Sequence, residues 1–167
     1  MQSNFTLYII GVLLLFTSCK NTVGKETVPS ETDYSKGSYD ISWINGNWID
    51  STKFGFKKLH YFENWKKISS TNYSCSKFTS KNGIKNEGSE INLVKNNNKF
   101  YYSFDYKNEQ ITYYSDSLSD NYIRLISPID KFPQTIEYKR IEDTLFISQS
   151  GMVGGVFRNP IYKALKY

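Results

Sequence analysis

The side chains that could carry out catalysis are carboxylates in separate short segments of the chain. Glu63, Glu90, Asp105 and Glu137 each lie in a stretch with strand-like alternation, so any two of them could meet in a folded sheet. Glycoside hydrolysis needs two carboxylates at a defined separation, and nothing in this spacing fixes one. The sequence also shows no nucleophile elbow, phosphate-binding loop or zinc-ligand spacing. We therefore predict no catalytic residues and no cofactor.

Glu63 is the most informative of these carboxylates because of its neighbours. Alternation along a strand places it on the same face as Tyr61 and Trp65. If that face points inward, the carboxylate needs a partner such as Arg124 or Arg140. A structural ion pair is one interpretation of Glu63. The other is a catalytic role on lipid or glycan, which we keep as a third hypothesis for the protein's function.

A metal site and a catalytic thiol both lack support. His60 is the single histidine, and alternation turns it away from the face that carries Tyr61 and Glu63. One histidine with no cysteine or second histidine nearby makes a poor metal site, so we predict none. Cys75 lies in a strand-like stretch, and we predict a buried structural thiol there.

The first nineteen residues contain no Lys, Arg, Asp or Glu. An apolar run from Leu7 to Phe16 is about half the length that spans a bilayer, and small residues then lead into Cys19. This pattern resembles the bacterial lipoprotein signal, although the n-region has no Lys or Arg and Phe16 replaces the usual aliphatic residue. The alternatives are an uncleaved signal-anchor and an ordinary secretory peptide.

The resemblance implies that residues 1–18 are a signal peptide and that Cys19 carries the lipid that anchors the mature chain to a membrane. We expect a location in the bacterial cell envelope, most naturally the outer membrane. Residues 19–40 are rich in Ser, Thr, Lys and Glu without an apolar period, which predicts a flexible tether. The net charge of +5 arises from scattered lysines, so we predict no nucleic-acid partner.

Residues 41–167 have the pattern of an all-β domain. Short aromatic and β-branched runs alternate with turn signals rich in Asn, Asp and Gly, and no stretch keeps a helical period for long. This pattern predicts an antiparallel up-and-down β-barrel of about 8–10 strands, which can enclose one small ligand. The expected strands are Trp48–Asp50, Phe56–Lys66, Thr71–Thr79, Gly88–Lys95, Lys99–Tyr106, Gln110–Ser115, Tyr122–Ser127, Gln134–Ile141, Thr144–Gln149 and Ile161–Lys166.

Three patches of this domain match known signatures. Residues 43–48 read W-x-x-G-x-W, residues 63–65 read E-x-W, and residues 132–138 read F-P-Q-x-I-x-Y. Together they resemble an uncharacterised bacterial family of lipocalin-like, calycin-type barrels, which implies structural roles for Trp43, Gly46, Trp48 and Pro133. That family commonly has His-Asp before Phe-Pro-Gln, where this chain has Asp130-Lys131. Any acid–base or metal role of that histidine is therefore lost here.

Pro133 explains part of the late signature. It lacks an N–H and fixes its φ, so it suits a bend that leads into a strand, and it favours an extended Phe132. Phe132 can then plug the barrel mouth while Gln134 satisfies backbone groups left open by the bend. Alternatively, both side chains line the opening through which a ligand enters.

We conclude from the sequence that the chain is an envelope lipoprotein whose barrel binds a small apolar or amphipathic ligand without catalysis. The alternative is a structural or interaction lipoprotein with a solid barrel, which acts through its outer face on a protein partner that the sequence does not identify. The residues expected to contact the ligand are Glu63, Trp65, Tyr102, Phe104, Phe132, Gln134 and Tyr138.

Overall fold

The structure is a computed structural model that describes residues 39–50, 59–86 and 88–167. The predictions for the signal peptide, for Cys19 and for residues 20–38 of the tether lie outside these residues. Within them, no helix is long and apolar enough to cross a bilayer.

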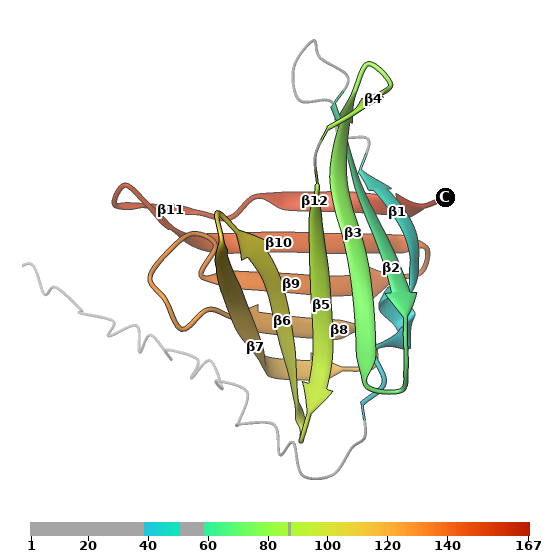
Figure 1. Cartoon of the computed structure of the whole chain (residues 1–167), viewed down its shortest axis with the longest axis vertical. Helices are drawn as coiled ribbons and strands as arrows, with labels where there is room; N and C mark the ends of the chain where they lie inside the picture. Colours follow the sequence, from blue (N-terminus) through green and yellow to red (C-terminus); the bar gives the residue numbers. More distant parts are fainter. Residues whose placement is uncertain (1–38, 51–58, 87) are drawn as a thin grey trace, which may run out of the picture. The chain divides into compact units, whose positions relative to one another are not determined.

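Almost all of the regular structure is β-strand (Figure 1). A 3-10 turn, η1 (Ser42–Ile44), precedes the first strand that the structure describes. The strands are β1 (Gly46–Asp50), β2 (Leu59–Lys67), β3 (Asn72–Lys81), β4 (Ile84–Lys85), β5 (Ser89–Asn96), β6 (Lys99–Tyr106), β7 (Glu109–Ser119), β8 (Tyr122–Ile126), β9 (Thr135–Ile141), β10 (Thr144–Val153), β11 (Val156–Arg158) and β12 (Ile161–Lys166).

The sheet closes on itself as an antiparallel barrel. The strands pair in the order β1-β2-β3-β5-β6-β7-β8-β9-β10-β12, and β12 pairs with β1. Two of the twelve described strands lie outside this ring, because β4 pairs only with β3 and β11 only with β10. The predicted fold class is therefore confirmed, and the ring contains the ten strands that alternation predicts.

The hairpin turns lie at the predicted breaks. The backbone φ is positive at Asn82, Asn97, Lys107, Asn108 and Glu142, each in a short connection between neighbouring strands. Tight hairpin turns need left-handed residues to match the twist of the strands, and Asn tolerates this conformation best after Gly. Local turn chemistry thus sets most of the strand boundaries.

Two strands, β7 and β10, extend four residues past their predicted ends. β7 continues to Ser119, past a bulge between Ser115 and Ser117 that shifts the alternation and buries Leu118. The Ser115 hydroxyl accepts a hydrogen bond from the Phe100 N–H at 2.8 Å, which helps to hold this irregular segment. β10 continues to Val153 and forms a hairpin with β11, so Gly154 and Gly155 occupy its turn.

One end of the barrel is filled by side chains and covered by η1. Ile41 and Ile44 are fully buried beside Trp48, whose indole N–H donates to the Ile44 carbonyl at 2.7 Å. The core around them includes Trp65, Tyr73, Leu93, Phe100, Leu125 and Leu145. We call this end of the barrel the closed end.

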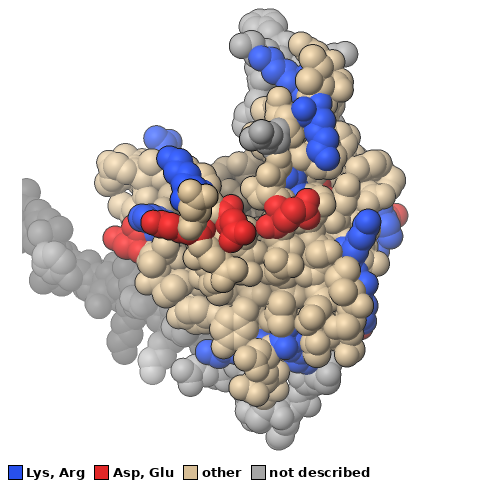
Figure 2. Space-filling view, viewed as in Figure 1, with Lys and Arg blue, Asp and Glu red and all other residues tan. Residues whose placement is uncertain are grey.

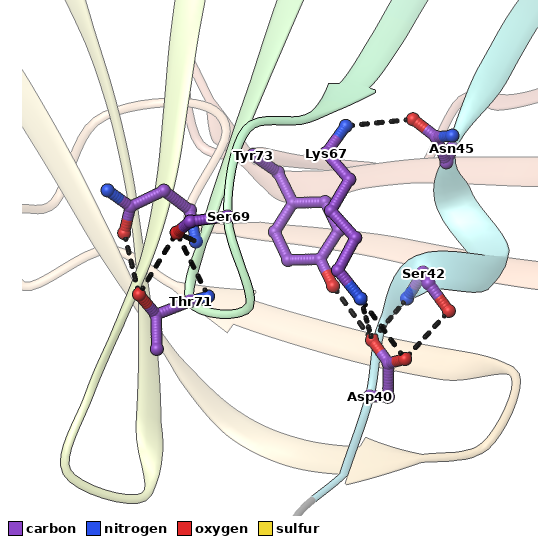
Figure 3. Close-up of polar contacts among 8 residues, drawn as sticks. Asp40, Ser42, Asn45, Lys67, Ser69, Thr71 and Tyr73 are labelled. Carbon is purple, nitrogen blue, oxygen red and sulfur yellow. Dashed lines mark hydrogen bonds and ion pairs between the residues drawn. The ribbon is translucent and has the colours of Figure 1, made fainter.

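Two residues that precede the predicted boundary at residue 41 contact the barrel. Tyr39 packs against the core, and Asp40 accepts hydrogen bonds from Tyr73 at 2.8 Å and from Ser42 at 2.9 Å (Figure 3). These hydrogen bonds, with Lys67 at 3.4 Å, lower the pKa of Asp40 to about 2. Both residues, which their polar surroundings in the sequence assign to the tether, therefore make contacts with the barrel.

Candidate functional site

The described residues leave three adjoining hollows inside and at the mouth of the barrel. The inner cavity has a volume of about 170 Å³ and is lined by Trp48, Asp50, Tyr61, Glu63, Lys77, Ile147, Gln149, Tyr162 and Ala164. The side cavity, of about 180 Å³, shares Lys77 and Gln149 with it and adds Ser89, Ile91, Tyr102, Phe104, Pro133 and Ile136.

The third hollow is a groove at the mouth of the barrel, with a volume of about 600 Å³. It shares Phe104 and Pro133 with the side cavity and is also lined by Tyr106, Lys107, Glu109, Ile111, Tyr113, Ile129, Lys131 and Phe132. Neighbouring hollows share lining residues, so they lie next to one another between the mouth and the interior of the barrel. The walls are mainly apolar and aromatic, with charged or polar groups both at the inner end and at the mouth, as in sites that bind small amphipathic molecules.

A buried ion pair lies where the inner and side cavities meet. The register of the β2–β3 hairpin places Lys77 directly opposite Glu63, and both side chains point inward. The Lys77 ammonium lies 2.7 Å from Glu63 Oε1, while the Trp65 indole N–H donates to Glu63 Oε2 at 3.0 Å. Tyr138 adds a longer hydroxyl contact to Glu63 Oε1, at 3.5 Å. The carboxylate is therefore well compensated although its side chain is only 4% exposed.

The predicted ion pair of Glu63 is confirmed, but its predicted arginine partners are wrong. Arg124 lies on the outer face of β8 and makes two hydrogen bonds to Asp116, at 2.8 and 2.9 Å. Arg140 lies near the closed end, where it donates to the Trp43 carbonyl at 3.0 Å. The register of the β2–β3 hairpin decides which residue pairs with Glu63. That register cannot be inferred from the charges in the sequence alone.

Burial and charge act in opposite directions on Lys77. Burial alone lowers the pKa of its ammonium, but the negative charge of Glu63 and the hydrogen bond between them raise the pKa above its usual value. Burial also raises the pKa values of Tyr102 and Tyr138. Both phenols therefore keep their protons at neutral pH and act as neutral polar groups beside the pair.

The structure brings five of the seven predicted ligand contacts to the cavities or to the ion pair. Glu63, Tyr102 and Phe104 line the inner or side cavity. Trp65 and Tyr138 lie beneath Glu63 and contact its carboxylate, with their rings packed edge-to-face at 5.7 Å. They support the polar end of the cavity rather than line it.

The other two predicted contacts lie on the loop that ends at Gln134. Phe132 is 37% exposed and lines the mouth groove, so it stands at the opening. Gln134 lies outside the residues that line the three hollows. Its side-chain oxygen accepts a hydrogen bond from the Met152 N–H at 3.0 Å, and its amide nitrogen donates to Asp130. The backbone group that the Gln134 side chain satisfies is therefore the Met152 N–H of β10 and not a group of the bend itself.

The cavity also contains residues that the sequence did not single out as ligand contacts: Asp50, Tyr61, Lys77, Gln149 and Tyr162. A signal for Lys77 was present, because Tyr73 and Cys75 alternate with it on the inner face of β3. When a charged residue shares a strand face with two buried residues, its side chain points into the protein. Such a charge usually has a partner or a function there. Cys75 itself is fully buried, as predicted, and burial raises the pKa of its thiol.

The signature residues build the ends of the barrel. Trp43 and Trp48 lie at the closed end, where the Arg140 guanidinium lies 5.8 Å from the Trp48 ring centre. Gly46 begins β1 with φ +137°, a conformation that side chains disfavour. At the other end, the Pro133 carbonyl accepts a hydrogen bond from the Tyr113 hydroxyl at 2.8 Å, which fastens the mouth loop to β7.

The remaining carboxylates considered for catalysis point away from Glu63. Glu137 accepts a hydrogen bond from Tyr122 at 2.6 Å, while Glu90 accepts one from Ser76 at 2.9 Å. Glu90 and Asp105 are exposed, and acidic side chains form a band across the face of β5, β6 and β7 (Figure 2). Among the described residues, no group of three or more His, Cys, Asp or Glu side chains could hold a metal ion.

Comparison with known proteins supports the fold alone. No family model matches the chain, and no curated protein matches it. Among solved structures, the crystal structure of Rv2717c from M. tuberculosis is similar, with a TM-score of 0.50 and 13% sequence identity. The match covers 74% of this chain and 91% of the other. At this level of identity the likeness shows that the two proteins share a barrel architecture.

Proposed function

We propose that this protein is a lipid-anchored envelope lipoprotein of the lipocalin-like type, whose barrel binds one small apolar or amphipathic molecule without catalysis. The observation that carries the proposal is the series of adjoining hollows, with mainly apolar walls, between the mouth groove and the inner cavity. At its inner end lie the Glu63–Lys77 pair and the neutral amide of Gln149. Such a site suits a ligand with an apolar body and one polar group.

Filling the inner cavity tests ligand binding. Ala164 is buried and lines this cavity, so Ala164→Phe places a ring where the ligand would lie. We expect native mass spectrometry of protein from its own host to show a bound small molecule in the wild type and none in the variant. Ile161→Phe, at a position 60% exposed, is the matched control and should keep the ligand. A wild-type protein that carries no ligand and binds none from a panel of amphiphiles would contradict the proposal.

The lipid anchor has a separate test. Cys19→Ala removes the sulfur that the lipoprotein pathway modifies, so the variant should leave the detergent phase for the aqueous phase when expressed in the native host. Cys75→Ala is the control, because that thiol is buried in the barrel and cannot carry a lipid there. Unchanged partitioning of Cys19→Ala would contradict the anchor.

One observation favours the alternative function, in which the outer face contacts a partner. The β10–β11 hairpin exposes an apolar group that consists of Met152, Val153, Val156 and Phe157, each between 46% and 62% exposed. An exposed apolar cluster of this kind is typical of a contact surface. Cross-linking in cells tests this function. Phe157→Ser should remove a cross-linked product, whereas Val94→Ser, at an exposed position on β5, should not.

A further inference from the structure

Lys77 lines both interior cavities, whereas Glu63 lines only the inner one of the two. The Lys77 side chain is 27% exposed and that of Glu63 is 4% exposed. Because Lys77 lines both cavities, the exposed part of its side chain faces them. An ammonium has three N–H donors, and Glu63 Oε1 accepts one of them at 2.7 Å. Lys77 can therefore donate a hydrogen bond to a ligand in the side cavity without leaving Glu63.

Other polar groups of the side cavity complete a site for a ligand's head group around Lys77. Tyr102 and Gln149 line this cavity together with Lys77, and Ser89 adds a hydroxyl. Burial raises the pKa of Tyr102, so its phenol stays protonated and can donate to a ligand oxygen. The side-chain amide of Gln149 can donate or accept a hydrogen bond. The rest of the wall is apolar and consists of Ile91, Phe104, Pro133 and Ile136.

The Glu63–Lys77 pair decides which head groups this site accepts. The opposite charges lie 2.7 Å apart, so the pair attracts a second carboxylate only weakly, because Glu63 repels it while Lys77 attracts it. A carboxylate would still lose its hydration on entering a mainly apolar cavity. Transfer of Lys77 from Glu63 to the ligand would leave Glu63 buried without its cation, which is costly. An uncharged carbonyl or hydroxyl avoids these costs and can still accept a hydrogen bond from Lys77.

We propose that Lys77, Tyr102 and Gln149 form a head-group site in the side cavity for amphipathic molecules whose head group is an uncharged carbonyl or hydroxyl. In this site Glu63 determines specificity, because it holds the charge of Lys77 and thereby disfavours carboxylates. This inference rests on the proposed ligand-binding function and specifies its ligand class. The side cavity, of about 180 Å³, is large enough for a small organic molecule. It shares Phe104 and Pro133 with the mouth groove, so an apolar chain that extends beyond the side cavity lies against these two residues.

Octanamide and octanoate test the selectivity, because they have the same chain and nearly the same shape but differ in charge. The full chain, stripped of bound ligand, is titrated with each probe at neutral pH by calorimetry. We expect octanamide to bind at least about tenfold more tightly than octanoate. Glu63→Gln frees the charge of Lys77, so octanoate should bind to this variant at least about tenfold more tightly than to the wild type. The affinity for octanamide should change by less than about threefold.

Two control variants isolate the cause of this gain. Glu63→Gln combined with Lys77→Gln carries neither charge and should not gain affinity for octanoate. Glu90→Gln makes the same chemical change at an exposed position on β5, where Glu90 accepts a hydrogen bond from Ser76, and should leave both affinities unchanged. A gain in the double variant, or no gain in Glu63→Gln, would overturn the role of Glu63.

Tyr102→Phe keeps the test decisive if Glu63→Gln does not fold. It removes one donor from the head-group site, so the infrared carbonyl stretch of bound octanamide, isotope-labelled at the carbonyl, should move to higher frequency. An unchanged stretch would overturn the head-group site. Equal binding of the two probes to the wild type, or tighter binding of octanoate, would overturn the selectivity while leaving ligand binding intact. Binding of neither probe would overturn both proposals.

Discussion

Gln134 and Gly151 lie in contact where the mouth loop meets β10. The Gln134 N–H donates to the Ser150 carbonyl at 2.8 Å, and the Gln134 side chain accepts a hydrogen bond from the Met152 N–H at 3.0 Å. A Cβ on Gly151 would lie 2.9 Å from the Gln134 nitrogen, and the φ of Gly151 is +155°. The absence of a side chain at Gly151 therefore allows Gln134 to fasten the mouth loop to the barrel.

Gly151→Ala should destabilise the protein by about 2 kcal/mol or more, because it combines an unfavourable φ with a backbone clash. Gly154→Ala is the matched control. Gly154 also has a positive φ, +57°, but a Cβ there meets nothing within 4 Å, so the expected cost is about 1 kcal/mol. Urea unfolding measures both values, and equal costs would show that the contact with Gln134 does not matter.

The Glu63–Lys77 pair should show strong energetic coupling. Lys77→Met leaves the Glu63 carboxylate buried without its cation and should cost about 2–3 kcal/mol, less than for a fully buried pair because the Lys77 side chain is 27% exposed. A double-mutant cycle with Glu63→Gln should give a coupling energy above about 1 kcal/mol. The Arg124–Asp116 pair, with side chains 43% and 26% exposed, is the control and should give less. Similar coupling in the two pairs would contradict the interior position of Glu63.

Stability should fall steeply in alkaline solution. Burial raises the pKa values of Tyr102 and Tyr138 above the ordinary 10.0, and Glu63 raises that of Lys77 above 10.5 despite its burial. Above about pH 10 the unfolded chain loses these protons while the folded chain keeps them, so the free energy of unfolding decreases as pH rises. Below that pH these groups are protonated in both states, so they do not make the free energy of unfolding depend on pH.

Urea unfolding from about pH 8 to pH 11 measures this slope, and phenolate absorbance counts the ionised tyrosines in the folded and unfolded chains. Tyr138→Phe should make the slope shallower. Tyr106→Phe, which removes a hydroxyl from a side chain 55% exposed, is the matched control. If the folded and unfolded wild-type chains formed phenolate to the same extent at every pH, the burial of Tyr102 and Tyr138 would be refuted.

Asp40 should control the acid limit of stability. Hydrogen bonds from Tyr73 and Ser42 lower its pKa from 3.8 to about 2, so its contribution is present above pH 3.8 and is lost as pH falls through about 2. Tyr73→Phe removes the strongest donor, and the pKa of Asp40 should then rise toward 3.8, as measured by NMR titration of its carboxyl. The loss of stability at neutral pH should stay below about 1 kcal/mol, because the carboxylate is 56% exposed. Ser42→Ala should shift the pKa less, and no shift in Tyr73→Phe would show that this hydrogen bond is absent.

The barrel was predictable because its signals are local. Alternation along β6 places Phe100 and Tyr102 on one face, and turn residues such as Asn97 and Asn108 end the hairpins where the sequence indicates. The bulge in β7 was not predictable in this way. Residues 115–119 have no apolar alternation, and the extra residue takes its position from pairing with β8 and from the hydrogen bond between Ser115 and Phe100.

The candidate site was predictable only in part. Glu63 stands out in the sequence because it alternates in phase with two aromatic residues, which is a property of one strand. Its cation depends on the register of a hairpin, and the arginines favoured by charge alone face elsewhere. Asp50 and Tyr162 line one cavity only because β12 closes the barrel against β1, which brings together two ends of the domain.

The sequence by itself determined that this domain is an antiparallel barrel with an aromatic interior, since side-chain alternation and turn chemistry act over a few neighbouring residues. Only the tertiary structure decided which groups share that interior. Strand register and barrel closure place Asp50, Lys77 and Tyr162, which are distant in the chain, around one cavity. The residues that line a cavity can therefore be identified only after the strands have been placed.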